Sequence, residues 1–260
     1  MKVLLIVKEF KVQRVDWICI QEMSITENYN DFLNRISYQQ ADLQIGEGYF
    51  NPDGRAYEKV NPDNTFKPFY GNTVVFDLDS STKTRIYKII EKLYKSVPEC
   101  FCQRLDKSTL HMTLHDLSAS DNLDSIMPEV FYNEIKLLQI IIDYPQNPQT
   151  IRMKTNFVIN MVSTSLVLAL VPADEAEWDK LQTLYDLINE VKICPYPYLT
   201  PHITLAYFNY NGFDAGSVQK LKEVVNELNK ESFEITLNSK KLVYQKFTSM
   251  NDYISIFNLV

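Results

Sequence analysis

The chain carries the same four-residue pattern twice, and each copy has the alternation of a β-strand. The copies are His111-Met112-Thr113-Leu114 and His202-Ile203-Thr204-Leu205. Residues i and i+2 of a strand point to the same face of the sheet. Each copy therefore places an imidazole beside a hydroxyl on one face and apolar side chains on the other. The apolar face can anchor the strand to a core.

The chain has only 3 histidines, and the two patterns use two of them. If the two strands meet, two imidazoles can accept and donate protons in one reaction near neutral pH. Two hydroxyls beside them can hold the oxygens of an anion. We therefore predict that His111, Thr113, His202 and Thr204 are catalytic and cleave a phosphodiester without a metal ion. If the repeats were coincidental, the imidazoles could lie more than about 12 Å apart, too far to flank one phosphate.

The paired motifs resemble the 2H phosphoesterase superfamily, which includes the LigT-like RNA 2′,3′-cyclic phosphodiesterases. The spacing of 91 residues between His111 and His202 is similar to that of family members. The strand that contains Gly71, Asn72 and Thr73 also resembles the Gly-Asn-Thr strand of an uncharacterised bacterial and fungal branch of the family. The resemblance covers roughly residues 50–260.

The resemblance implies a bilobal α+β fold, with two antiparallel sheets that face each other across a central cleft and helices outside. A weak internal repeat agrees, because a strand and a helix precede each His-x-Thr strand. In LigT-like relatives the usual product is a 2′-phosphate, which implies that His202 activates water. The residues alone leave open which histidine is the acid and which is the base.

Four further residues are predicted to bind the substrate. Tyr70 and Asn72 accompany the Gly-Asn-Thr strand, where Asn72 can line the cleft. Strand alternation puts His115 on the face of His111 and Thr113. Tyr198, in a proline-stiffened loop before the second motif, can stack on a base.

Composition favours a small ligand. The formal net charge is −7 and the sequence pI is about 5.1, whereas proteins that hold long nucleic acids are basic where they bind. We expect a small nucleotide or an oligonucleotide end as substrate, and no extended nucleic-acid interface. No apolar run is long enough to span a bilayer, so we expect no membrane association. The 4 cysteines indicate a reduced, cytoplasmic protein, and no residue cluster indicates a metal or another cofactor.

The chain is expected to divide at residue 69. Residues 1–69, rich in turn signals after residue 46, predict an N-terminal extension packed on the bilobal domain of residues 70–260. Periodicity predicts helices near residues 27–38, 80–96, 123–132, 172–192 and 215–230. It predicts strands at residues 73–77, 110–117, 135–143, 151–161, 165–171, 202–207, 233–237, 242–246 and 253–257.

The sequence thus favours a metal-independent phosphodiesterase that opens a 2′,3′-cyclic phosphate or cleaves a small phosphodiester at a nucleotide or RNA end. The alternative is a non-catalytic module that binds a nucleotide or RNA end on the same fold. Two intact proton-transfer groups argue against a site that only binds. The oligomeric state is not predicted by these patterns.

Overall fold

A computed structural model describes residues 27–192 and 198–260 of the chain. Within them, the helices are α1 (Tyr29–Gln40), α2 (Gly54–Lys59), α3 (Ser80–Ser96), α4 (Leu123–Asp143), α5 (Glu175–Asn189) and α6 (Ala215–Leu228). The strands are β1 (Tyr70–Asp77), β2 (His111–Ser120), β3 (Thr150–Met161), β4 (Ser165–Pro172), β5 (His202–Tyr207), β6 (Glu234–Asn238), β7 (Leu242–Ser249) and β8 (Asp252–Asn258).

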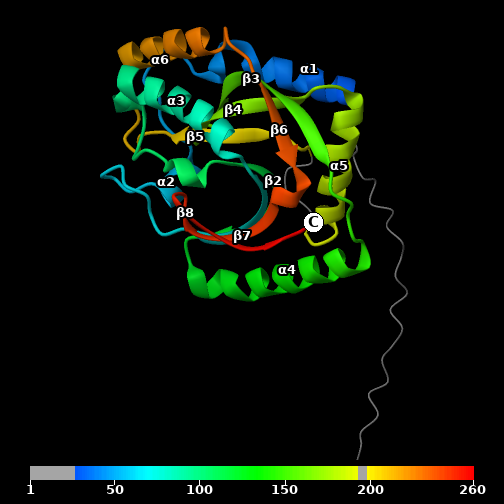
Figure 1. The fold of residues 1–260 in the computed structure, drawn as a ribbon. Helices are drawn as coiled ribbons and strands as arrows, with labels where there is room; N and C mark the ends of the chain where they lie inside the picture. Colours follow the sequence, from blue (N-terminus) through cyan, green and yellow to red (C-terminus); the bar gives the residue numbers. More distant parts are fainter. Residues whose placement is uncertain (1–26, 193–197) are drawn as a thin grey trace, which may run out of the picture.

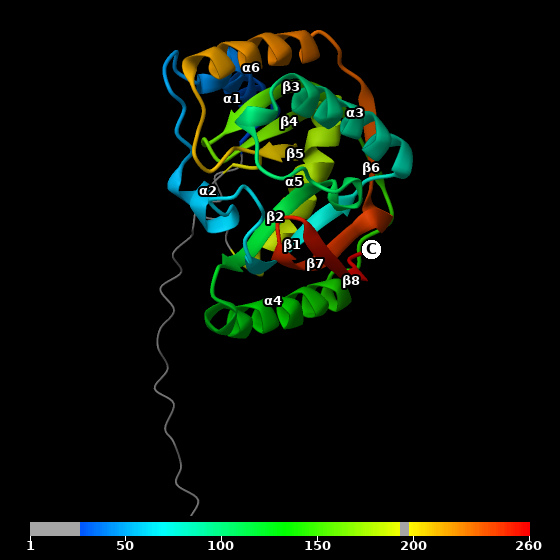
Figure 2. The same ribbon diagram turned by 90° about the vertical axis from the view of Figure 1, so that its left-hand side faces the viewer.

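The strands form two four-stranded antiparallel sheets, in the orders β2-β1-β7-β8 and β5-β4-β3-β6. Each motif strand is the edge strand of its own sheet, and β2 lies next to β5. Helix α4 covers the first sheet from outside, while α3 and α6 lie beyond the second (Figures 1 and 2). The predicted α+β class with two antiparallel sheets is confirmed.

Helix α3 shows how local sequence sets an element. Ile86, Ile90 and Leu93 recur at helical spacing and are fully buried in the main core. The helix begins after Asp79, whose carboxylate accepts hydrogen bonds from the backbone N–H groups of Ser81 and Thr82. An aspartate suits this N-cap position because its carboxylate also interacts favourably with the positive end of the helix dipole.

Helix α4 corrects one prediction. Residues 135–143 were expected to form a strand, but the helix that starts at Leu123 continues to Asp143. Val130, Leu137 and Ile140 follow a helical period and are buried against the first sheet. The apolar residues between them, on other faces of the helix, gave this segment the appearance of a continuous apolar strand.

The described part of the N-terminal region contributes to the main core. Phe32 of α1 is fully buried and stacks on Trp178 of α5, with 4.4 Å between ring centroids. Phe50 forms a backbone bridge with Phe213, just before α6, and the two rings stack with centroids 4.7 Å apart. The boundary at residue 69 stays a prediction, since no observation tests it. Residues 1–26 lie outside the described residues.

Two further observations concern the whole described region. None of its helices combines the length and apolarity needed to cross a membrane. Cys100 and Cys102 are buried free thiols, and burial raises the pKa of each to about 12. These two thiols are therefore poor nucleophiles.

Candidate active site

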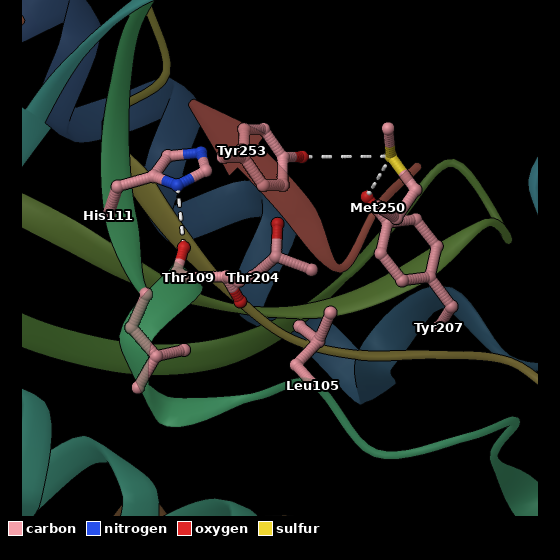
Figure 3. A pocket seen from close by; sticks show the side chains of 8 residues that line it. Leu105, Thr109, His111, Thr204, Tyr207, Met250 and Tyr253 are labelled. Atoms are coloured by element: carbon pink, nitrogen blue, oxygen red, sulfur yellow. Dashed lines mark hydrogen bonds between the residues drawn. The ribbon is translucent and has the colours of Figure 1, made fainter. Parts of the chain in front are cut away.

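His111 is fixed at the start of β2 by a hydrogen bond within its own segment. Its Nδ1 lies 2.7 Å from the backbone carbonyl oxygen of Thr109 (Figure 3). A carbonyl only accepts, so Nδ1 carries the hydrogen and donates it. In the neutral imidazole, Nε2 is then the atom with a free lone pair. The ring also packs edge-on against Tyr253 of β8, with centroids 4.9 Å apart.

His202 repeats this arrangement at the start of β5. Its Nδ1 lies 2.7 Å from the carbonyl oxygen of Thr200, again two residues earlier in the chain. The same tautomer follows, with Nε2 free to exchange a proton. Both histidines are only partly buried by their surroundings. The two motifs therefore agree in hydrogen bonding as well as in sequence.

A small cavity joins the two motifs. His111 from β2 and Thr204 from β5 both line it, together with Thr109, Tyr207, Met250 and Tyr253 among others (Figure 3). The described residues of its lining do not include Thr113 or His202, which lie on the same two strands. Its volume of ≈ 20 Å³ suits one water-sized group. The body of any larger ligand would have to lie outside it.

Both motif strands are irregular directly after the threonine. In β2 the pairing with β1 passes from Thr113 to His115, so Leu114 has no partner. In β5 the pairing with β4 passes from Thr204 to Ala206, so Leu205 has none. A bulge of this kind shifts the alternation of side chains by one residue. The shift turns Asp116 and Tyr207, each five residues after its histidine, to the face of the motif.

Asp116 brings a negative charge to this face. Burial lowers the pKa of His111 to about 4, while the Thr109 carbonyl and the Asp116 carboxylate act to raise it. Burial also lowers the pKa of His202, against the Thr200 carbonyl and Asp116. A charge on His202 lowers the pKa of His111 further. The two imidazoles and the carboxylate are therefore near enough to interact, and both histidines are mainly neutral at pH 7.

Lys59, at the end of α2, brings a cation to the same region. Its ammonium lies 5.3 Å from the ring centroid of Phe69 and 5.7 Å from that of Tyr207. Burial lowers the pKa of Lys59, and Asp116 acts in the opposite direction. Within the described residues this ammonium has no hydrogen-bond or ion-pair partner. A half-buried cation without a partner provides a place for an anion.

Two predicted substrate-binding residues lie away from this face. His115 is buried against α5, where its ring packs on Tyr185 and its Nε2 lies 2.8 Å from Asn189 Oδ1. The expectation that His115 shares a face with His111 is wrong, because the bulge at Leu114 reverses the alternation. Asn72 is buried beneath α4, where its side-chain NH₂ donates to Tyr244 Oη at 3.0 Å. It does not line the cavity.

The Gly-Asn-Thr strand instead supports the irregular backbone of β2. A Cβ at Gly71 would lie 2.1 Å from the Ser118 carbonyl oxygen, so only glycine fits there. Asn72 Oδ1 accepts from the Ser118 N–H at 3.1 Å, and Thr73 Oγ1 donates to the His115 carbonyl at 3.1 Å. These bonds occur at the two register shifts of β2. The motif thus stabilises the conformation that exposes Asp116.

The other two predicted binding residues are not brought to the cavity lining. Tyr70, at the first position of β1, pairs with Ser120 at the end of β2 remote from His111. Tyr198 is 38 % exposed, and the Arg35 guanidinium lies 5.5 Å from its ring centroid. Arg35 also donates to the Leu199 carbonyl and so ties this segment to α1. Substrate binding by these two tyrosines stays a prediction.

Sequence reasoning missed four residues of this region, for two reasons. Asp116 and Tyr207 are placed by bulges, which simple alternation does not include. Lys59 and Tyr253 come from distant segments that only the fold brings together. The one available signal was the leucine that follows the threonine in both motifs, since this is the residue that bulges. In the described residues, no group of three histidine, cysteine or acidic side chains is arranged to hold a metal ion.

No protein-family profile and no curated protein matches the chain. Similar solved structures include ATU0111 from Agrobacterium tumefaciens str. C58, a conserved protein of unknown function. It has 15% identity and a TM-score of 0.62, over 81% of this chain and 94% of that chain. They also include E. coli LigT complexed with 3′-AMP, at 14% identity and a TM-score of 0.42 over 73% and 96% of the two chains. A structure described as a phosphoesterase has 13% identity and a TM-score of 0.42 over the same shares. At these identities the likeness concerns the fold alone.

Proposed function

We propose that this protein is a metal-independent phosphodiesterase that opens a 2′,3′-cyclic phosphate or cleaves a small phosphodiester at a nucleotide or RNA end. The observation that carries the proposal is that His111 and Thr204, from motifs 91 residues apart, line one cavity. Both motif histidines also leave Nε2 free. Two such imidazoles can accept one proton and donate another during a reaction at one phosphorus atom.

In the proposed reaction, one neutral histidine takes a proton from water as the water oxygen bonds to phosphorus. The other histidine, protonated, gives its proton to the ribose oxygen as the P–O bond to that oxygen breaks. The product is a phosphomonoester with a free hydroxyl. Thr113 and Thr204 donate hydrogen bonds to the non-bridging oxygens, where negative charge builds up.

A bound phosphate also changes the protonation of the site. Burial lowers the pKa of both histidines and so favours their neutral forms. A phosphate anion between them raises both pKa values, so that one histidine becomes the acid. Activity is then expected to be bell-shaped in pH, with a higher optimum for kcat than for kcat/KM.

The direct test is turnover in the presence of EDTA on 2′,3′-cyclic mononucleotides and short RNAs with cyclic-phosphate ends. We expect hydrolysis that survives chelation and is lost in both His111→Ala and His202→Ala. His115→Gln is the matched control, since the third histidine packs on α5, and it should retain activity. Ligand binding without turnover in any variant would favour the non-catalytic alternative.

Lys59 is proposed to neutralise the phosphate as it binds. Lys59→Met keeps the length of the side chain and removes its charge, so KM should rise about tenfold or more while the fold persists. Lys67→Met is the control, because Lys67 belongs to the same segment but donates to the Tyr57 carbonyl. An equal change of KM in both variants would contradict the proposal that Lys59 binds the phosphate.

A further inference from the structure

Helix α4 has a second apolar face, which points away from the sheet it covers. Phe131, Ile135, Leu138 and Ile142 lie on this face and are 54, 65, 43 and 77 % exposed. Their spacing of four, three and four residues is that of a coiled-coil seam. The opposite face carries Val130, Leu137 and Ile140 and is buried on the first sheet. A helix that is apolar all round is normally covered on both sides.

The apolar surface continues from α4 onto β8. The Lys246 ammonium lies 5.5 Å from the ring centroid of Phe131, and Ile254 pairs directly opposite Lys246. Ile254 is 55 % exposed. The patch consists of Phe131, Tyr132, Ile135, Leu138, Ile142 and Ile254.

The size of this patch approaches half of a stable protein interface. Its six side chains expose the equivalent of between three and four complete side chains. At roughly 150–200 Å² for a large side chain, this is about 530–700 Å². A standard interface buries about 800 Å² on each partner, whereas the largest patch on a typical monomer is about 300–600 Å².

The charges at the border of the patch favour an uncharged partner surface. Glu134 is paired with Lys246, and Glu129 with Lys192 at 2.5 Å. The Lys136 ammonium, 5.7 Å from the Tyr132 ring centroid, is offset by the carboxylate of Asp143, which follows Ile142. Together these groups leave little net charge with which to hold an anionic lipid surface or a charged peptide. The chain as a whole carries −7, which an anionic membrane would repel.

We propose that two copies of this chain pair antiparallel through the apolar faces of α4. The seam reads four, three, four in either direction, so it is complementary to itself in the antiparallel sense. A two-fold axis between Ile135 and Leu138 would pack Phe131 against Ile142 of the partner subunit. Antiparallel packing also sets each helix dipole against an opposite one. The pairing does not depend on the proposed catalysis, since α4 covers the sheet face opposite the motifs.

The first test is the mass of the full chain in solution across a concentration series. We expect twice 30.4 kDa at micromolar concentration. Ile135→Glu and Leu138→Glu should each raise the dimer dissociation constant at least about a hundredfold, because they bury like charges at the seam. Their circular dichroism should be unchanged, since both side chains are exposed. Tyr38→Glu, which changes an exposed aromatic residue of α1 (77 % exposed), should leave the dimer intact.

Cross-linking tests the direction of pairing. A mixture of Phe131→Cys and Ile142→Cys chains should form a disulfide-linked dimer under mild oxidation, and neither variant alone should exceed the unsubstituted chain. Self-linking of each variant alone would overturn the antiparallel arrangement. A monomer at all concentrations would overturn the proposal, as would a monomer that floats with phosphatidylcholine vesicles, which would assign the patch to a membrane instead.

Discussion

Strands β2 and β5 each carry a histidine and a threonine on the motif face, but they differ at the fifth residue after the histidine. In both, the histidine donates to a carbonyl two residues earlier and the leucine bulges. The bulge of β2 then exposes the carboxylate of Asp116, whereas that of β5 places Tyr207 beside Met250. The common part supports proton transfer, and the difference makes one side of the site anionic and the other aromatic.

This asymmetry bears on the roles of the two histidines. A charge on His202 lowers the pKa of His111, so the two imidazoles oppose each other's protonation and one proton on the pair is favoured over two. The family resemblance implies that His202 is the base that activates water. Coupled groups share their protons, so the roles have to be separated by chemistry rather than by resting charge.

The largest expected effect is on the two histidines themselves. His111→Ala and His202→Ala should each lower kcat about 10²–10⁴-fold on a cyclic phosphate. A nitrophenyl phosphodiester has a leaving group that needs no proton, so turnover should recover only in the variant that lost the acid. Recovery in His111→Ala would make His202 the base, and recovery in His202→Ala would reverse the roles. Equal recovery in both would contradict a division of labour.

The next effect concerns stability as a function of pH. The pKa of His111 is about 4 in the folded chain and 6.5 as its ordinary value. Between these values the unfolded chain binds a proton that the folded chain does not, so stability falls as the pH drops below 6.5. The share of His111 is about 2–3 kcal/mol by pH 4. Urea unfolding of His111→Gln should show a smaller loss between pH 7 and pH 4 than the unsubstituted chain, and an equal loss would contradict the shift.

Asp116 and Tyr207 offer the sharpest comparison between the strands. Asp116→Asn removes a carboxylate that raises the pKa of both histidines, so both limbs of the kcat/KM profile should move to lower pH, by up to about one unit. Tyr207→Phe should leave both limbs in place, because burial raises the pKa of Tyr207 well above its ordinary value and the phenol stays neutral. A shift in the tyrosine variant would show that the two positions act alike.

The smallest effect is expected at the support of the β2 bulge. Thr73→Val removes the hydrogen bond to the His115 carbonyl and should cost about 1 kcal/mol of unfolding free energy. It should also lower kcat/KM a few-fold, since Asp116 is then held less firmly. Thr155→Val is the control, because Thr155 is an equally buried threonine that accepts from the Phe233 N–H on the other sheet. A loss of activity in the control of the same size would contradict a specific role for Thr73.

The sequence was sufficient for regular elements and insufficient where the backbone departs from regularity. Alternation placed His111 with Thr113, and His202 with Thr204, because each pair precedes its bulge. It failed at His115, one residue beyond. It also failed at residues 135–143, where apolar side chains on both faces of α4 hid the helical period. Lys59 could not be found from a local pattern, since its neighbours Phe69 and Tyr207 come from other segments.

The bulges also change how each strand responds to substitution. The proposed functional positions of each strand are the first, third and sixth of a six-residue unit that starts at the histidine, and the second, fourth and fifth are buried. The sixth residue of the β2 unit, Asp116, is exposed, so a substitution there can alter the charge beside the histidines while the core stays intact. The leucine at the fourth position is buried away from the motif face. Its bulge nevertheless decides which of the later side chains in the strand point to that face. Deletion of this leucine from β2 would therefore bring a different side chain to the place of Asp116. The charge of the site would change, although both histidines would stay in the chain.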